Sequence, residues 1–337
     1  MQQDVGAAGG FAVVAAAAEF VAARQAGKPS PHTVRAYERD LQAVLGYAAT
    51  VVGRDPEEVG LGELSTAVMR RAFAGFAESR AASSVLRAWS TWNQFFGFLV
   101  AEGRVQGNPM SGVSRPRVQR CEPKPLVGED TPERLVEAVA AGCRRARDPW
   151  PERDVAVVAL ALVTGLRSAE LLTLRVDSLG GRAGERRLRV LGKGDRVRWV
   201  PVEQPLEAVV QAYLVSRESR FGVVLQGSDA LLVDRRGQAL RRGGLQYLVR
   251  QCYRYAGVGD RVARGALVHA LRHTFATRLA EDGASVTEIM RLLGHSSVVS
   301  AQAYIGVTAQ AQRAAAGANR TYGVVRRVAG TSEEDAD

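Results

Sequence analysis

Residues 107–127 divide this chain into two parts, because four prolines fall within that short stretch. The prolines and the basic residues between them are Pro109, Arg115, Pro116, Arg117, Arg120, Pro123, Lys124 and Pro125. Each proline fixes φ and removes a backbone donor, so we expect no regular element in this segment. A chain of 337 residues is long enough for two domains. We therefore expect one folded domain on either side.

The residues before this segment have the spacing of helices. Apolar side chains recur at helical intervals in four stretches, at about 11–25, 31–48, 66–79 and 83–102. Ser30 and Pro31 are typical of a helix start, with serine as the cap and proline in the first turn. We expect a compact bundle made of helices alone.

The residues after the segment predict a mixed but mostly helical domain. Two short strands are expected at 187–191 and 197–202, and they flank Gly192-Lys193-Gly194-Asp195, whose glycines and aspartate suit a hairpin turn. Helical patterns surround them, at about 131–145, 154–164, 205–219, 243–256, 269–282 and 285–293. The fold class is therefore mainly α with one small antiparallel sheet.

The charge balance favours a polyanionic partner. The formal net charge is +10, and without the four acids of residues 332–337 it is +14. Nucleic acid is the commonest polyanion that basic proteins bind. The basic segment 107–127 is then either a solvated linker or a strap that lies along phosphates.

Cysteine usage and hydropathy limit the cellular setting. Cys121, Cys143 and Cys252 are scattered and odd in number, which fits a reducing cytoplasm and argues against a disulfide framework. The apolar stretch 11–23 is mostly alanine and too short to span a membrane. His269 and His273 have the spacing of half a zinc site, but no third ligand is placed to complete it. We expect a cytoplasmic protein without metal or cofactor.

The residues with catalytic potential gather in the second part. Only three of the 45 basic residues are lysines, and one of them, Lys193, lies at the hairpin tip. Three of the four histidines fall between His269 and His295. Any one of these residues alone could be an ordinary surface or core residue. Their order along the chain is what indicates a catalytic site. That order is Arg167, Lys193, His269, Arg272, His295 and Tyr304.

This order closely resembles the signature of the tyrosine recombinase and integrase family. The signature is arginine, lysine, histidine-x-x-arginine, histidine or tryptophan, then tyrosine, and Tyr304 stands at the usual nine residues after His295. The stretches 33–37 and 40–41 and the pair Asn108-Pro109 look like the core-binding domain of Xer-like members. The resemblance covers about residues 12–310. It implies a SAM-like helical DNA-binding bundle followed by a catalytic domain.

The chemistry of DNA strand exchange explains these residue types. Attack on a phosphodiester adds charge to nonbridging oxygens, which two arginine forks would stabilise. Tyrosine would form a covalent intermediate that stores the bond energy, so that rejoining needs no ATP. Lys193 would protonate the leaving 5′-oxygen, His269 would share the tyrosine proton, and His295 would hydrogen-bond a nonbridging oxygen. Glu170 and His273 would orient these groups.

The resemblance also implies an assembly. Strand exchange between two duplexes needs four protomers, so the expected partners are a double-stranded core site and three further copies, with accessory DNA-bending proteins left open. Further DNA contacts are expected at Arg35, Arg115, Arg117, Arg120 and Lys124. The expected organisation is a flexible start (1–10), a core-binding domain (11–106), a linker (107–127), a catalytic domain (128–306), a protomer-docking segment (307–330) and an acidic tail (331–337). The alternative for residues 307–330 is that they fold back on their own domain.

Two other functions fit part of the pattern. A type IB topoisomerase would use the same tyrosine chemistry as a monomer without choosing a site, and relaxation of supercoiled DNA that lacks any cognate site would reveal it. A non-catalytic DNA-binding regulator should have lost at least one catalytic position, and none is missing here. The target site and the biological role, whether integration, resolution or transposition, stay open.

Overall fold

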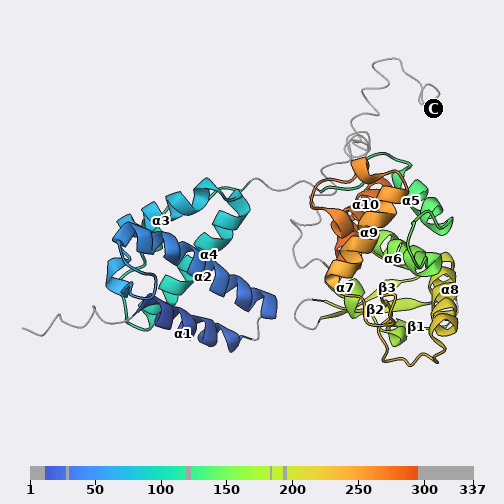
Figure 1. Cartoon of the computed structure of the whole chain (residues 1–337), viewed down its shortest axis with the longest axis horizontal. Helices are drawn as coiled ribbons and strands as arrows, with labels where there is room; N and C mark the ends of the chain where they lie inside the picture. The colour runs from blue at the N-terminus through green and yellow to red at the C-terminus, as the bar shows by residue number, and fades with distance from the viewer. Residues whose placement is uncertain (1–11, 28–29, 119–122, 183, 193–195, 295–337) are drawn as a thin grey trace, which may run out of the picture. The chain divides into compact units, whose positions relative to one another are not determined.

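The computed structural model describes residues 12–27, 30–118, 123–182, 184–192 and 196–294. The chain divides into two compact units, Met1–Cys121 and Glu122–Asp337. The expected fold class is confirmed, because helices dominate both units and the second carries a small antiparallel sheet (Figure 1). In the described part of the chain, no helix is both long and apolar enough to cross a membrane.

The first unit is a helical bundle with an aromatic core. Its helices are α1 (Val13–Gln25), α2 (Pro31–Val52), α3 (Thr66–Glu78) and α4 (Ala82–Ala101), with short 3₁₀ turns at Leu61–Glu63 and Pro109–Gly112. Ser30 caps α2 as expected, since its side chain accepts a hydrogen bond from the Thr33 backbone N–H. Phe20, Trp92 and Phe95 are fully buried, and their rings meet edge to face.

An ion pair between a buried carboxylate and an exposed arginine joins two helices of this bundle. Asp40 of α2 is only 2% exposed, and it accepts two hydrogen bonds from the Arg87 guanidinium of α4, at 2.7 and 2.8 Å. A buried carboxylate is tolerated when it is paired in this bidentate way. The pair therefore fixes how α2 and α4 sit against each other.

The expectation that residues 107–127 form no regular element is wrong at their start. Pro109–Gly112 forms a 3₁₀ turn that Asn108 caps, and Met110 is fully buried in the bundle. The Trp89 indole N–H donates to the Val113 carbonyl at 2.9 Å. Proline is compatible with the first position of such a turn, and the apolar residues that follow it gain burial. The start of the segment thus packs on the first unit.

The second unit builds its core around one apolar helix. Its elements are α5 (Thr131–Ala140), α6 (Pro151–Thr164), α7 (Ser168–Thr173), β1 (Leu179–Gly180), β2 (Arg187–Leu191), β3 (Val197–Pro201), α8 (Gln204–Phe221), α9 (Arg242–Tyr255), α10 (Leu267–Glu281) and α11 (Val286–Leu293). Helix α6 is buried along most of its length and contacts α5, α8, α9 and α10 (Figure 1). It therefore ends at a crowded point, where the candidate site begins.

The sheet is antiparallel in the order β1-β2-β3. The hairpin of β2 and β3 was expected, and Leu188 pairs with Val200 on its buried face. The strand β1 and the helix α7 were not expected, because each is too short to show a period. The helix predicted for 131–145 ends at Ala140 instead, and Gly142 follows with a φ of 70°.

Candidate active site

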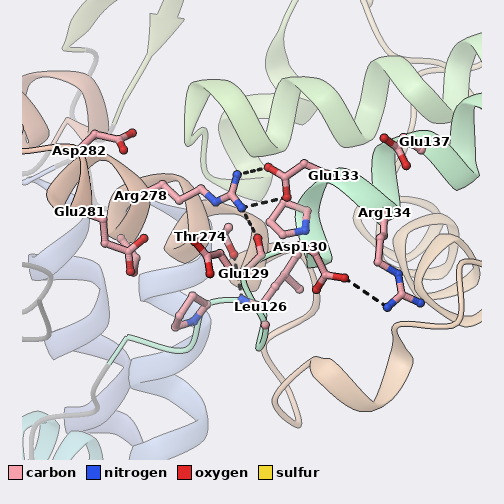
Figure 2. A pocket seen from close by; sticks show the side chains of 14 residues that line it. Leu126, Glu129, Asp130, Glu133, Arg134, Glu137, Thr274, Arg278, Glu281 and Asp282 are labelled. Carbon is pink, nitrogen blue, oxygen red and sulfur yellow. Dashed lines mark hydrogen bonds and ion pairs between the residues drawn. The ribbon is translucent and has the colours of Figure 1, made fainter. Parts of the chain in front are cut away.

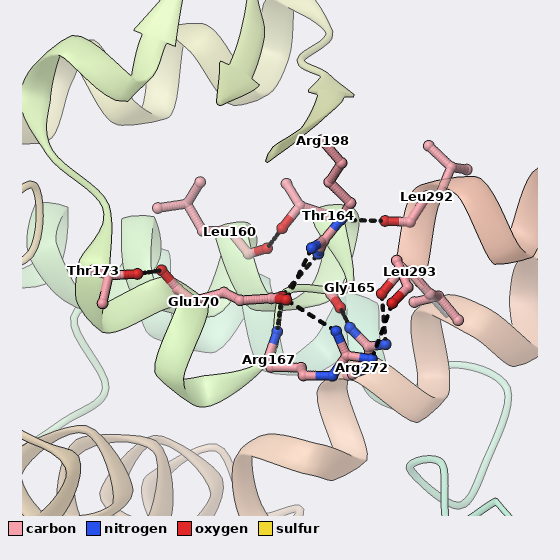
Figure 3. Close-up of polar contacts among 11 residues, drawn as sticks. Leu160, Thr164, Gly165, Arg167, Glu170, Thr173, Arg198, Arg272, Leu292 and Leu293 are labelled. Atoms are coloured by element: carbon pink, nitrogen blue, oxygen red, sulfur yellow. Dashed lines mark hydrogen bonds and ion pairs between the residues drawn. The ribbon is translucent and has the colours of Figure 1, made fainter. Parts of the chain in front are cut away.

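Arg272 lies at the centre of the site, held by the ends of two helices. It belongs to α10 and is 4% exposed. Its guanidinium donates to the carbonyl of Gly165, the cap of α6, and at 2.9 Å to the carbonyl of Leu293, the last residue of α11 (Figure 3). Carbonyl groups at helix C-termini carry partial negative charge, which makes them suitable partners for a buried cation. Arg272 is therefore fixed before any ligand arrives.

The Arg167 side chain also lies at the C-terminal end of α6, close to Arg272. It is the residue before α7, and its backbone N–H donates to Glu170 Oε2 at 2.8 Å. Its side chain donates to Glu170 Oε1 at 2.9 Å and to the Gly294 carbonyl at 3.3 Å. Arg167 and Arg272 thus contact consecutive carbonyls at the end of α11. The fold brings together two cations that are 105 residues apart in the sequence.

Glu170 binds a third arginine that the sequence did not single out. Arg198 of β3 donates to both carboxylate oxygens of Glu170, each at 2.8 Å. Burial alone would raise the pKa of Glu170, but the hydrogen bonds from Arg198 and the Arg167 backbone outweigh it and lower the pKa to about 2. The available sequence signal was an arginine on the inward-facing side of a strand, two residues before buried Val200.

His269 and His273 lie on successive turns of α10, with ring centroids 6.0 Å apart. Partial desolvation lowers the pKa of His269, and the charges of Arg272 and Arg167 lower it further. Desolvation and the neighbouring His269 lower the pKa of His273 to about 4. His269 is therefore a neutral imidazole at pH 7, beside two arginines, and can accept a proton.

Three of the residues expected in the site, Lys193, His295 and Tyr304, lie outside the described residues. Two glycines that adjoin them in the sequence are described. A Cβ on Gly192 would come within 3.9 Å of Glu170 Oε1, and a Cβ on Gly294 would come within 3.1 Å of the Arg198 guanidinium carbon. The chain segments that lead to Lys193 and to His295 therefore both approach the pair formed by Glu170 and Arg198.

The residues expected to contact DNA are exposed wherever they are described. Arg35 is exposed on α2 and donates to the Pro31 carbonyl at 3.3 Å. Arg115 lies over the Trp89 ring at 5.8 Å, and Arg117 and Lys124 are exposed in the segment between the two units. Arg120 lies outside the described residues.

A separate groove lies between α5 and α10 and has the opposite charge. Six carboxylates and two arginines line it, and Arg278 pairs there with Glu133 (Figure 2). Such a surface repels phosphates, and the cluster of Arg167, Arg198 and Arg272 (the arginine cluster) does not line it. Among the described residues, no three His, Cys, Asp or Glu side chains gather as they would around a metal ion.

Fold and site together define a protein with a helical bundle, a mostly helical second unit and an arginine cluster suited to a phosphate group. Sequence comparison gives the family. The profile of the phage integrase family matches residues 127–311, and that of the phage integrase N-terminal SAM-like domain matches residues 20–103. The chain belongs to the phage integrase family and is a site-specific tyrosine recombinase.

Individual relatives agree with this family. Tyrosine recombinase XerC of Mycobacterium bovis (strain BCG / Pasteur 1173P2) is 34% identical over 87% of this chain and 93% of its own length. Tyrosine recombinase XerD of Listeria monocytogenes serotype 4b is 30% identical over 83% of this chain and 89% of its own. The relatives named here are recombinases, so a topoisomerase or a non-catalytic regulator is not favoured.

Solved structures share the fold. The XerH site-specific recombinase in a post-cleavage complex with its difH substrate matches with a TM-score of 0.69 and 18% identity, over 85% of this chain and 79% of that one. The Tn1549 transposon integrase in complex with transposon right end DNA matches with a TM-score of 0.66 and 16% identity, over 89% and 98%.

Proposed function

We propose that this recombinase cuts and rejoins DNA through a covalent link between Tyr304 and a 3′-phosphate, at a site that the arginine cluster organises. The observation that supports this most directly is the convergence of Arg167 and Arg272 on the last carbonyls of α11, immediately before His295. A scissile phosphate bound between the two guanidinium groups would lie beside the chain segment that carries the remaining catalytic residues.

Electrostatics would supply much of the rate acceleration. The transition state carries extra charge on the nonbridging oxygens, and fixed donors stabilise it without any reorganisation. Arg272 meets this requirement because two helix ends hold it, and guanidinium groups stay charged at every working pH. We assign to both arginines, together with His295, the binding of nonbridging oxygens.

Proton transfers complete the reaction. The Tyr304 hydroxyl oxygen attacks phosphorus, its proton passes to His269, and the bond from phosphorus to the 5′-oxygen breaks. Lys193 gives its proton to that leaving oxygen, a step that arginine could not perform. Rejoining reverses these steps with a 5′-hydroxyl as the nucleophile, so the phosphodiester energy is conserved without ATP or metal. His273 would orient His269, and Glu170 would orient Arg167.

The assembly that we propose has four protomers on two duplexes, and each protomer would bind one half of a core site. The domain boundaries are those expected from the sequence, at 11–106 and 128–306, with 107–127 between them. Arg35, Arg115, Arg117, Arg120 and Lys124 would contact backbone phosphates, which fix the register but carry no sequence information. The reaction would take place in the cytoplasm, where the DNA lies, and accessory DNA-bending proteins would be optional partners.

The role of Lys193 offers a direct test of this mechanism. Lys193→Ala should cleave ordinary DNA about 100-fold or more slowly, because the leaving oxygen lacks its acid. A substrate with a 5′-bridging phosphorothiolate, whose sulfur leaves without a proton, should restore most of the cleavage. Single-turnover cleavage of both substrates is the measurement. Equal defects on both would contradict the assignment of Lys193 as the acid.

A further inference from the structure

Three arginines and one carboxylate make up the cluster at the end of α6. Glu170 Oε1 accepts from Arg198 at 2.8 Å and from the Arg167 side chain at 2.9 Å. Glu170 Oε2 accepts from Arg198 and from the Arg167 backbone, each at 2.8 Å. Arg167 and Arg198 therefore share one negative charge, and the position of each depends on the other.

The two arginines that share Glu170 differ in exposure. The Arg198 side chain is 13% exposed, whereas that of Arg167 is 37% exposed. Each Arg198 nitrogen atom already donates to a protein group, since Nε donates to the Leu292 carbonyl at 3.1 Å and both Nη atoms donate to Glu170 (Figure 3). Arg198 is thus directed into the protein, and Arg167 is the one that solvent and ligands can reach.

A carboxylate this close to Arg167 should weaken the attraction between that arginine and a phosphate. If Glu170 were paired with Arg167 alone, one full negative charge would oppose the incoming phosphate and would draw the guanidinium away from it. The bidentate contact from Arg198 neutralises that charge and leaves Glu170 able to orient Arg167. The third Arg198 contact, to Leu292, holds β3 against the end of α11.

We propose that Arg198 is a positioning residue that neutralises Glu170, so that Arg167 can offer its positive charge to the scissile phosphate. This rests on the proposed function, in which Arg167 binds that phosphate. Arg198 itself does not touch DNA in this account. If Arg198 acts in this way, its removal should slow cleavage because the charge of Glu170 is no longer neutralised, which a purely structural role would not predict.

A double-mutant cycle separates these roles. Arg198→Gln, Glu170→Gln and the double variant would be compared with the unmodified protein in single-turnover cleavage of a nicked suicide substrate at saturating protein. DNA affinity would be measured in a Tyr304→Phe background. The matched control is Arg186→Gln, which breaks an Arg–Glu pair of the same unit, with Glu207 at 3.0 Å. Thermal denaturation would report whether each variant folds.

We expect Arg198→Gln to slow cleavage by about 10- to 100-fold with DNA affinity changed less than about twofold, because one fixed charge partner is lost. The double variant should cleave at least about fivefold faster than Arg198→Gln, because Glu170→Gln removes the carboxylate charge that is no longer neutralised. Arg186→Gln should cleave like the unmodified protein. The double variant has neither the Glu170 charge nor the Arg198 charge, so no buried charge loses its partner. If Arg198→Gln folds poorly, the double variant can still be compared with Glu170→Gln.

Three outcomes would overturn the proposal. Arg198→Gln could cleave at the normal rate, or the double variant could be no faster than Arg198→Gln, which would leave a structural role only. Rescue of Arg198→Gln by a 5′-bridging phosphorothiolate would show that it acts through the Lys193 hairpin instead. Failure of the proposed function looks different, because the unmodified protein would then form no covalent adduct with DNA.

Discussion

Two buried arginines of the second unit are held in place by different kinds of group. Arg153 is 6% exposed and pairs at 2.8 Å with the carboxylate of Asp154, which also binds Arg144. Arg272 is 4% exposed, and the carbonyls of Gly165 and Leu293 at two helix ends accept hydrogen bonds from its guanidinium. A phosphate that approaches Arg272 therefore meets a cation already in position.

The pH dependence of cleavage should report on His269. Its pKa lies below the usual 6.5, so the imidazole stays neutral at pH 7 and can accept the tyrosine proton. As the pH falls through this lowered pKa the imidazole becomes protonated, and the cleavage rate should fall with it. His269→Gln should cleave about 100-fold more slowly at pH 7 and lose this acidic limb. Single-turnover rates between pH 5 and 8 are the measurement.

His273 provides the comparison, because its pKa is about 4 and it stays neutral over that whole range. His273→Asn should therefore keep the shape of the pH profile, whatever its effect on the rate. An acidic limb that survives in His269→Gln would assign the titration to another group and would contradict the proposed role.

Site residues that lie in short motifs of characteristic spacing, such as His269 and Arg272, could be predicted from the sequence. It did not predict Arg198. The partners of that residue, Glu170 and Leu292, lie 28 and 94 positions away, and only the folded chain brings them together. In a chain with 42 arginines, one more gives no local signal.

The end of α6 is the element on which the site depends most. Gly165 caps this helix with a φ of 59°, accepts from Arg272 and lies two residues before Arg167. A Cβ at this position would overlap the Phe275 ring on α10 and come within 2.8 Å of Leu293 on α11. The close packing of three helices therefore requires glycine here.

Substitution of this glycine should cost more than its backbone conformation alone explains. Gly165→Ala should lower the free energy of unfolding by about 3 kcal/mol or more, from left-handed strain plus overpacking, and should also slow cleavage. Gly222 is the control, because it caps α8 with a φ of 63° and has open space around it. Gly222→Ala should cost only about 1 kcal/mol. Equal losses in denaturant unfolding would contradict this account.

Element prediction from the sequence succeeded where periods are long or caps are explicit, as at Ser30 for α2. It failed for β1 and α7, which span two and six residues and are held by tertiary contacts rather than by local preference. The 3₁₀ turn at Pro109–Gly112 was missed because four prolines suggested a uniformly irregular segment. Burial of Met110 in the helical bundle stabilises the turn at this position.

At the scale of the whole molecule, the two units agree with the two family profiles, one in each unit. The proposed tetramer depends on residues 307–330, which lie outside the described residues. Their sequence is rich in alanine up to Ala318 and apolar at Tyr322, Val324, Val325 and Val328. We propose that this segment docks on a neighbouring protomer and links their active sites.

Truncation after Gly306 tests this docking. The shortened protein should still bind a single half-site but should lose cooperative binding to the full site and form no synaptic tetramer, because its apolar contact with the neighbour is gone. Native gels and mass photometry give the stoichiometry. Truncation after Gly330 is the control, since it removes only the acidic end and should leave tetramers intact. Unchanged tetramer formation in the shorter protein would exclude docking between protomers.

Covalent catalysis by Tyr304 can be tested directly by mapping the protein–DNA adduct. The unmodified protein and Tyr304→Phe would be incubated with a nicked suicide substrate in EDTA and without ATP, and the SDS-resistant adducts would be digested and mapped by mass spectrometry. We expect an adduct on the peptide that contains Tyr304, no adduct in the variant, and nearly equal DNA binding by both proteins. An adduct that persists in Tyr304→Phe, for example on Tyr322, would contradict it.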